Sequence, residues 1–473
     1  MFYSRPVNWL VVFSDRRMAL SIAAALGVLA LSVWLASGSM SPYAVSLRAM
    51  SRGPYVGNID DKHFEATYLM LRGKNRSQWE SSVVLRRTLY PLIAYPFMRA
   101  AGFAWGGFVA SLLLQLGSVL AFAEFAARRF GRHAAITAAW LLATYPGIMY
   151  WAGLPYSYAI IVPACLVGGI ILWELQEAAG VRRISMLSLG LGVLFLGYDL
   201  LPLLAPAAVA VLLWRRHWTG ALVSIPAMLL PTVLNSALLW WIWQVPFRNK
   251  NTSPYFAILE AWLNPSDTAR WARYLAELPS LAVGQFLFSN FLFLPVLFVL
   301  ALLLGRGILK VRLSRVEMAL LATIGAAFLF NNLAPPYKGV QLRGPDMARL
   351  YQPLLVVMVL YIPRVVQQAA QRPAALKVAS TLFALTVALN ATVAFGPLLK
   401  NPLASWLFHR FYSRHPPDMM LVNLEKYGRR PLGLYHGPRE LTPRAQQRQE
   451  RRLAQPSASQ PATAPDGTDE SDE

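Results

Sequence analysis

Two adjacent carboxylates, Asp60 and Asp61, stand in a chain that is otherwise poor in acidic residues. Only 23 of its 473 residues are Asp or Glu, against 44 Lys and Arg. Neighbouring like charges raise one another's pKa, which suits a general base, and carboxylate oxygens can also hold a divalent cation. The pair predicts a base acting on an acceptor hydroxyl or a cation ligand. The alternative is an ordinary solvated loop with surface acids.

A second polar cluster lies late in the chain, where Arg343, Arg349 and Tyr351 precede an apolar segment and Lys338 comes a few residues earlier. The guanidinium of an arginine can donate two parallel hydrogen bonds to phosphate oxygens. The cluster therefore predicts a phosphate-binding element. Equally, Arg and Tyr at such a place can serve as plain interfacial anchors.

Long apolar segments must position both clusters. The chain is 56% hydrophobic and 14% charged, whereas soluble proteins carry about a quarter charged residues. Apolar stretches of about twenty residues, the length that crosses a bilayer, recur along most of the chain. We therefore expect an all-α, polytopic membrane protein with about eleven transmembrane helices. The predicted spans are 18–38, 103–127, 134–151, 156–177, 184–198, 199–214, 219–245, 281–304, 316–333, 349–366 and 376–396.

The division of residues 184–214 into two spans rests on helix length. Residues 184–214 as a single helix would extend for about 46 Å at 1.5 Å per residue, too long for ordinary tilt in a bilayer. Two short spans that meet at Tyr198-Asp199 fit better and keep the charge alternation. Asp199 is expected to cap the helix that follows it, with a functional role as the alternative.

Basic residues predict the orientation of the spans. Lys and Arg gather in alternate connections, which are those expected in the cytoplasm of a multi-pass protein of a cell inner (plasma) membrane. The net charge of +21 has this source together with the C-terminal tail. The partners predicted from charge are therefore membrane lipids and not nucleic acid. The basic connections are 128–132, 182–183, 215–216, 306–315 and 364–377.

Three longer connections are then expected on the outer side, 39–102, 246–280 and 334–348. They contain or adjoin both polar clusters. Inside the first, the apolar segment 83–100 is interrupted by Arg86, Arg87 and prolines, which predicts an interfacial helix lying on the membrane, and 403–413 is interpreted in the same way.

The chain is expected to form one transmembrane domain, 1–415, followed by a tail, 416–473. The tail is first basic and then rich in Ser, Pro and acidic residues, without apolar groups to bury, so we expect it to be largely disordered. An odd number of spans places the tail outside, although its basic part favours the inside.

The first outer loop carries a recognisable order of residues. Asp60-Asp61, with Phe64 three positions on, comes before Arg87-Thr88-Leu89-Tyr90-Pro91 in the same loop. This order resembles the GT-C superfamily of membrane glycosyltransferases, which includes lipid A aminoarabinose transferases and protein O-mannosyltransferases. In that family an acidic pair opens the first outer loop, and a Pro-Leu-Tyr-Pro-like stretch follows on an interfacial helix. Here Thr88 stands where a proline is often found.

The resemblance implies a role for each cluster. Asp60 would be the catalytic carboxylate, with Asp61 in the place of the usual Glu. Arg349 and Tyr351 would form the Arg-Tyr element that holds a carrier phosphate. The donor would be a sugar on a polyprenyl-phosphate carrier, and the acceptor an envelope lipid, glycan or protein. Further phosphate-binding candidates are Arg86, Arg87, Lys338 and Arg343.

Two other classes of protein stay open. One is a multi-span transporter or flippase of a lipid-linked or small anionic substrate, which would place helix breaks and buried charges midway through its spans. The other is a non-catalytic membrane assembly subunit. The chain has no Walker A motif, dinucleotide fingerprint or Gly-x-Ser-x-Gly motif, and no Cys/His cluster with zinc spacing. No cofactor is predicted, apart from a divalent cation that the acidic pair could hold.

Overall fold

The computed structural model describes residues 11–40, 87–145, 148, 157–198, 201–243, 293–333 and 352–395, and a few residues between 276 and 282. Throughout these residues the regular secondary structure is helical, which confirms the all-α class for the described part of the chain. The elements are η1 (Val11–Ser14), α1 (Arg16–Met40), α5 (Leu89–Arg129), α6 (Arg132–Ala143), η2 (Ser157–Ile160), α8 (Ile161–Glu177), α9 (Val181–Phe195), η3 (Leu201–Leu203), α10 (Leu204–Trp214), α11 (Trp218–Trp243), α14 (Phe293–Leu304), the π-helical η5 (Gly305–Leu309), α15 (Arg315–Leu333), α16 (Pro353–Ala369) and α17 (Pro373–Phe395).

Within the described residues, three helices are long and apolar enough to cross a membrane: Gly106–Arg129, Trp218–Ile242 and Pro373–Ala391. Each predicted span overlaps a described helix, but several of these helices are shorter than predicted. For example, α6 has 12 residues and α10 has 11, which is about 18 Å or less. The number of spans therefore stays a prediction.

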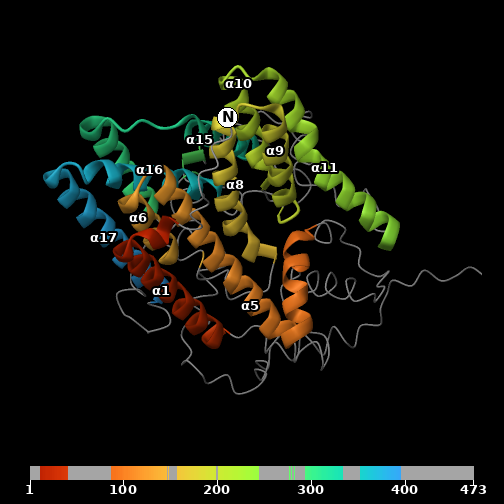
Figure 1. The fold of residues 1–473 in the computed structure, drawn as a ribbon, viewed down its shortest axis with the longest axis horizontal. Coiled ribbons are helices and arrows are strands. Elements are labelled where there is room, and N and C mark those ends of the chain that lie inside the picture. Colours follow the sequence, from red (N-terminus) through yellow and green to blue (C-terminus); the bar gives the residue numbers. More distant parts are fainter. Residues whose placement is uncertain are drawn as a thin grey trace, which may run out of the picture.

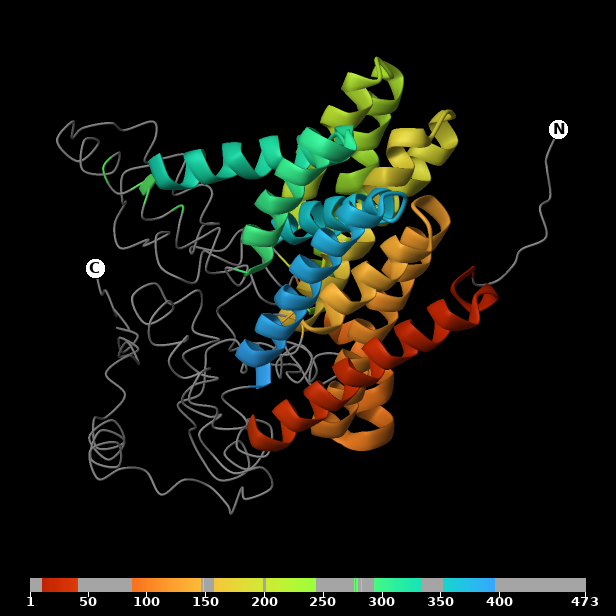
Figure 2. The ribbon, with the colours of Figure 1, turned by 90° about the vertical axis from the view of Figure 1, so that its left-hand side faces the viewer.

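The helices run back and forth between two ends of one bundle (Figures 1 and 2). Asp15, just before α1, pairs with Arg132 at the start of α6. Glu174, near the end of α8, pairs with Arg129 at the end of α5. We call the end that holds these pairs the basic end. At this end one helix finishes and the next begins, as expected from the basic residues in alternate connections of the sequence.

The most deeply buried helices are α6 and α16, which pack against each other. In α16, apolar side chains such as Val359 and Tyr361 are buried around most of the helix. By contrast, α11 at the edge of the bundle in Figure 1 exposes large apolar side chains, among them Leu222 and Trp241 at 71% each. An apolar rim of this kind is expected where helices face lipid.

Helix α5 folds back on itself. A straight helix of 41 residues would extend for about 61 Å. Instead, the Tyr90 hydroxyl lies 2.5 Å from Ser111 Oγ and 3.1 Å from the carbonyl oxygen of Gly107. The early part of α5 therefore packs on the later part, and Figure 1 shows the two orange arms meeting at an angle. The expected interfacial segment 83–100 is helical from Leu89 and rests on the predicted span beside it.

Residues 181–243 fold as two antiparallel helices and a long third helix, in agreement with the predicted break near Tyr198. The third helix, α11, packs closely along α9. At their crossing a Cβ atom on Gly192 would lie 2.3 Å from the carbonyl oxygen of Met228, so a glycine is required there. Small residues allow such close approach of helices in membranes. The pair positions the end of α9 beside the later part of α11.

Candidate functional site

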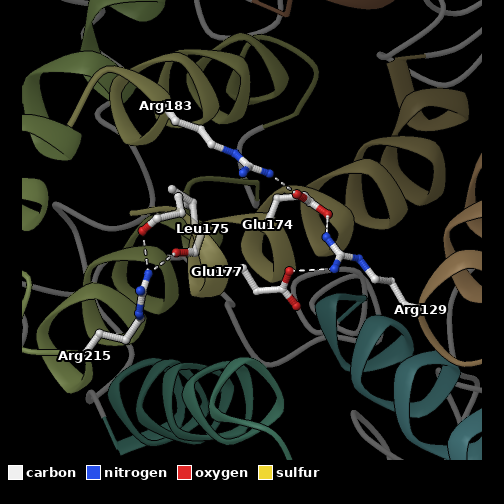
Figure 3. A network of polar contacts seen from close by, with 7 residues as sticks. Arg129, Glu174, Leu175, Glu177, Arg183 and Arg215 are labelled. Carbon is white, nitrogen blue, oxygen red and sulfur yellow. Dashed lines mark hydrogen bonds and ion pairs between the residues drawn. The ribbon is translucent and has the colours of Figure 1, made fainter. Parts of the chain in front are cut away.

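The basic end is held together by a network of arginines and glutamates (Figure 3). Glu174 pairs with Arg129 and Arg183, each at 2.5 Å, and Glu177 pairs with Arg129 at 2.6 Å. The guanidinium of Arg215 donates to two carbonyl oxygens at the end of α8, at 3.2 and 2.6 Å. The network fastens the ends of α5, α8 and α10 to the start of α9.

A buried ion pair lies at the same end, between Glu317 in α15 and Arg364 in α16. The Ser314 N–H donates to Glu317 Oε2 at 2.6 Å, and the Glu317 N–H donates to Ser314 Oγ at 3.2 Å. This reciprocal pair is a capping box at the start of α15. The Arg364 guanidinium also lies 5.6 Å from the Trp173 ring centroid, within range of a cation–π contact. Both charges therefore have structural roles.

Every acidic residue in the described part of the chain lies at the basic end and is paired with an arginine. At this end, the carboxylates of the described residues therefore hold helices together. The five acids are Asp15, Glu124, Glu174, Glu177 and Glu317.

The opposite end is where the described helices join the long connections. Helices α1 and α15 begin at the basic end, so both finish at the opposite end. The helix α16, which follows the second of the next segments, runs the other way and finishes at the basic end near Arg364. The start of α5, which follows the first, lies beside the end of α9, where the N–H of Leu89 donates to the carbonyl oxygen of Leu196. Segments 41–86 and 334–351 therefore both leave and rejoin the bundle at the opposite end. Both predicted polar clusters belong to these two segments.

Arg87 is the predicted site residue that the structure describes, and it lies at this opposite end. Its guanidinium carbon lies 4.3 Å from the ring centroid of Tyr198, the residue that precedes Asp199. The backbone holds the two partners together, because the N–H of Leu89 donates to the carbonyl oxygen of Leu196 at 3.2 Å. The stack fixes the plane of the guanidinium, and a planar fork of donors suits a phosphate group.

A second polar contact stands beside Arg87. The hydroxyl of Thr88 donates to the amide oxygen of Asn235 in α11 at 2.9 Å. Sequence reasoning did not single out Asn235, although an amide inside an otherwise apolar span is a usable signal. Arg87, Thr88, Tyr198 and Asn235, which we call the Arg87 cluster, join the start of α5, the turn after α9 and the interior of α11.

The other predicted site residues lie outside the described residues, as does Asp199. The structure therefore places one predicted site residue, Arg87, and the remaining positions stay sequence predictions. Those positions are Asp60, Asp61, Arg86, Lys338, Arg343, Arg349 and Tyr351.

Neither a metal site among the described residues nor a similar known protein adds information about the site. Among the described residues, no three His, Cys, Asp or Glu side chains gather where they could hold a metal ion. The acidic pair, for which a cation ligand was one of the predicted roles, lies outside these residues. Comparison of the chain with protein-family models, curated proteins and solved structures finds no match.

Proposed function

We propose that the chain is an integral membrane glycosyltransferase of GT-C type. It would move a sugar from a polyprenyl-phosphate carrier to an envelope lipid, glycan or protein on the outer side of a cell inner membrane. The basic end of the bundle would face the cytoplasm, and the Arg87 cluster would lie at the outer end. This orientation follows the rule that Lys and Arg collect on the cytoplasmic side.

The observation that carries the proposal is a coincidence of position. The two segments that contain Asp60-Asp61 and Arg343 to Tyr351 join the bundle at the end where Arg87 lies over Tyr198. A carboxylate pair and several phosphate-binding arginines attached to one end of a helical scaffold are the parts that transfer from a sugar phosphate needs. The described acids at the basic end are all engaged in ion pairs.

The proposed reaction is an inverting displacement at the anomeric carbon. Asp60 takes the proton of the acceptor hydroxyl while that oxygen bonds to the anomeric carbon. The bond between this carbon and the phosphate oxygen breaks, and polyprenyl phosphate leaves with the electron pair. Arg349 and Arg87 stabilise the charge that develops on the leaving phosphate.

The test is transfer by the purified full-length chain in lipid vesicles that contain polyprenyl-phosphate sugars and an envelope lipid extract. We expect Asp60→Asn to lower the transfer rate about a hundredfold or more, in the range of a lost general base. Asp61→Asn should lower it less. Elution from a sizing column shows that each variant is made and folded.

Equal transfer by the wild type and a folded Asp60→Asn variant contradicts the proposal. So does movement of the donor lipid between leaflets with no loss of its sugar, because that result identifies a flippase. A chain that neither transfers nor moves the donor is left with the role of an assembly subunit.

A further inference from the structure

We infer that the turn between α10 and α11 binds the headgroup of an anionic phospholipid, together with the neighbouring start of α9. The turn has the sequence Trp214-Arg215-Arg216-His217-Trp218, with three basic residues between two tryptophans. We call it the tryptophan-flanked turn. This inference does not depend on the glycosyltransferase proposal, because it concerns the basic end.

Two residues of the tryptophan-flanked turn fasten it to the protein. Arg215 donates to carbonyl oxygens at the end of α8. His217 Nδ1 accepts the N–H of Gly220 at 3.0 Å, so the proton of the ring is on Nε2, 3.1 Å from the carbonyl oxygen of Ala179. The backbone of the turn is therefore held in place, and a ligand would meet a preformed surface.

Arg216 lies between these two residues in the sequence. Its φ of 59° lies in the left-handed region, which costs energy in a residue other than glycine. Its side chain is exposed, as is that of Arg182 in the first turn of α9. In the described part of the chain neither guanidinium has an ion pair or hydrogen bond, because Glu174 and Glu177 are occupied by other arginines.

The two arginines belong to one corner of the bundle. A Cβ atom on Gly220 would lie 2.8 Å from Cδ1 of Ile184, so the first turns of α11 and α9 are in contact. Arg182 stands two residues before Ile184, and Arg216 stands four residues before Gly220. His217 links the same two connections through Ala179. The corner thus carries two exposed arginines, Arg182 and Arg216, on connections that are in contact.

The tryptophans indicate which anion fits. Trp214 is 50% exposed and Trp218 is 65% exposed, and Trp218 begins a helix that is long and apolar enough to cross a membrane. Tryptophan favours the headgroup layer of a bilayer. Its position here places Arg216 at the depth of lipid phosphates, where arginine attracts anionic headgroups. A membrane phospholipid therefore fits this corner better than a soluble phosphate does.

The experiment is native mass spectrometry of the purified full-length protein, titrated with phosphatidylglycerol or with phosphatidylcholine. We expect the wild type to prefer phosphatidylglycerol. The double variant Arg182→Gln/Arg216→Gln should lose about 30-fold in affinity for it, the product of two basic residues near an anionic surface. The matched control is Arg16→Gln/Arg17→Gln, which removes two exposed arginines from the same end of the bundle.

Three results would overturn the inference. The first is unchanged phosphatidylglycerol affinity in the Arg182/Arg216 double variant. The second is an equal loss in the control variant, which would show attraction by the whole basic end and no site. The third is displacement of phosphatidylglycerol by millimolar inorganic phosphate, which would identify a soluble ligand. Each variant is included only if it elutes from a sizing column at the same volume as the wild type, which shows that it is folded.

Discussion

The guanidinium carbon of Arg87 lies 4.3 Å from the centroid of the Tyr198 ring. This contact joins the residue that closes the first long connection to the turn after α9, two places separated by more than a hundred residues. A guanidinium stacked on a ring loses rotational freedom before any ligand binds. Tyr198 therefore acts on the proposed phosphate contact as a positioning residue, through Arg87.

We predict that Tyr198→Leu removes the stack and Tyr198→Phe retains most of it. The leucine variant should lose about 0.5–2 kcal/mol of unfolding free energy, the range of a partly desolvated cation–π contact. In the transfer assay it should raise the KM for the lipid-linked donor. Thermal unfolding in detergent and donor titration measure the two effects. If Phe and Leu variants behave alike, the ring is not what holds Arg87.

The bend in α5 gives a prediction with an internal control. A Cβ atom on Gly106 would lie 2.3 Å from the carbonyl oxygen of Phe97 and 2.4 Å from Cα of Met98, whereas one on Gly117 would have no neighbour within 4 Å. Gly106→Ala should therefore cost about 1–3 kcal/mol of unfolding free energy through overpacking.

The control, Gly117→Ala, lies in the same helix and should be neutral or stabilising by up to about 1 kcal/mol, since alanine favours helix. Thermal unfolding of both variants in the same detergent makes the comparison. Equal stability of the two variants would mean that the arms of α5 do not pack at Gly106.

The helices could be predicted from the sequence because each one contains a long apolar segment. Their alternating direction could be predicted because basic residues gather in every second connection. The break near Tyr198 was predicted correctly from helix length and charge. The folding back of α5 was not, because it depends on contacts between Tyr90 and Ser111, 21 residues apart. Apolar periodicity within one helix carries no information about such a contact.

The candidate site was predictable to a smaller extent. Arg87 interrupts an apolar segment, which is a local signal, and its phosphate-binding role was implied by the resemblance to the GT-C family. Its partner Tyr198 follows another helix, and Asn235, the partner of Thr88, lies on α11, which approaches α9 closely at Gly192. A pairing of this kind depends on the crossing of two helices, and a single sequence does not specify it.

The buried pair of Glu317 and Arg364 yields a prediction about stability at the basic end. Glu317→Ala leaves the Arg364 charge buried without its carboxylate, which should cost about 3–5 kcal/mol of unfolding free energy. Glu317→Gln keeps the capping box with Ser314 and should cost less. The comparison is Glu177→Ala, because the Glu177 side chain is 40% exposed in its pair with Arg129 and exposed pairs contribute about 0–1 kcal/mol.

Chemical denaturation of the purified protein measures the three variants. The order expected is Glu317→Ala least stable, then Glu317→Gln, then Glu177→Ala. A Glu177→Ala variant as unstable as Glu317→Ala would contradict the distinction between the buried and the exposed pair.

Asp15 makes stability depend on pH. The N–H of Met18, above all, lowers the pKa of its carboxyl, with further help from the Arg17 N–H and from the Arg132 guanidinium. A group with a lowered folded-state pKa stabilises the protein above its unfolded value, about 3.9 for Asp, and that contribution is lost as pH falls through the folded-state pKa. Asp15 should therefore stabilise α1 at neutral pH and cease to do so in acid.

The variant that tests this is Asp15→Asn, because asparagine caps a helix about as well as aspartate and removes only the charge. We expect the wild type to melt at a higher temperature than the variant at pH 7. The difference should persist down to about pH 4 and disappear at lower pH, where the carboxyl is protonated in both the folded and the unfolded chain. A difference that is constant with pH would assign the effect to the shape of the side chain. The charge of Asp15 would then contribute nothing to holding α1 beside α6.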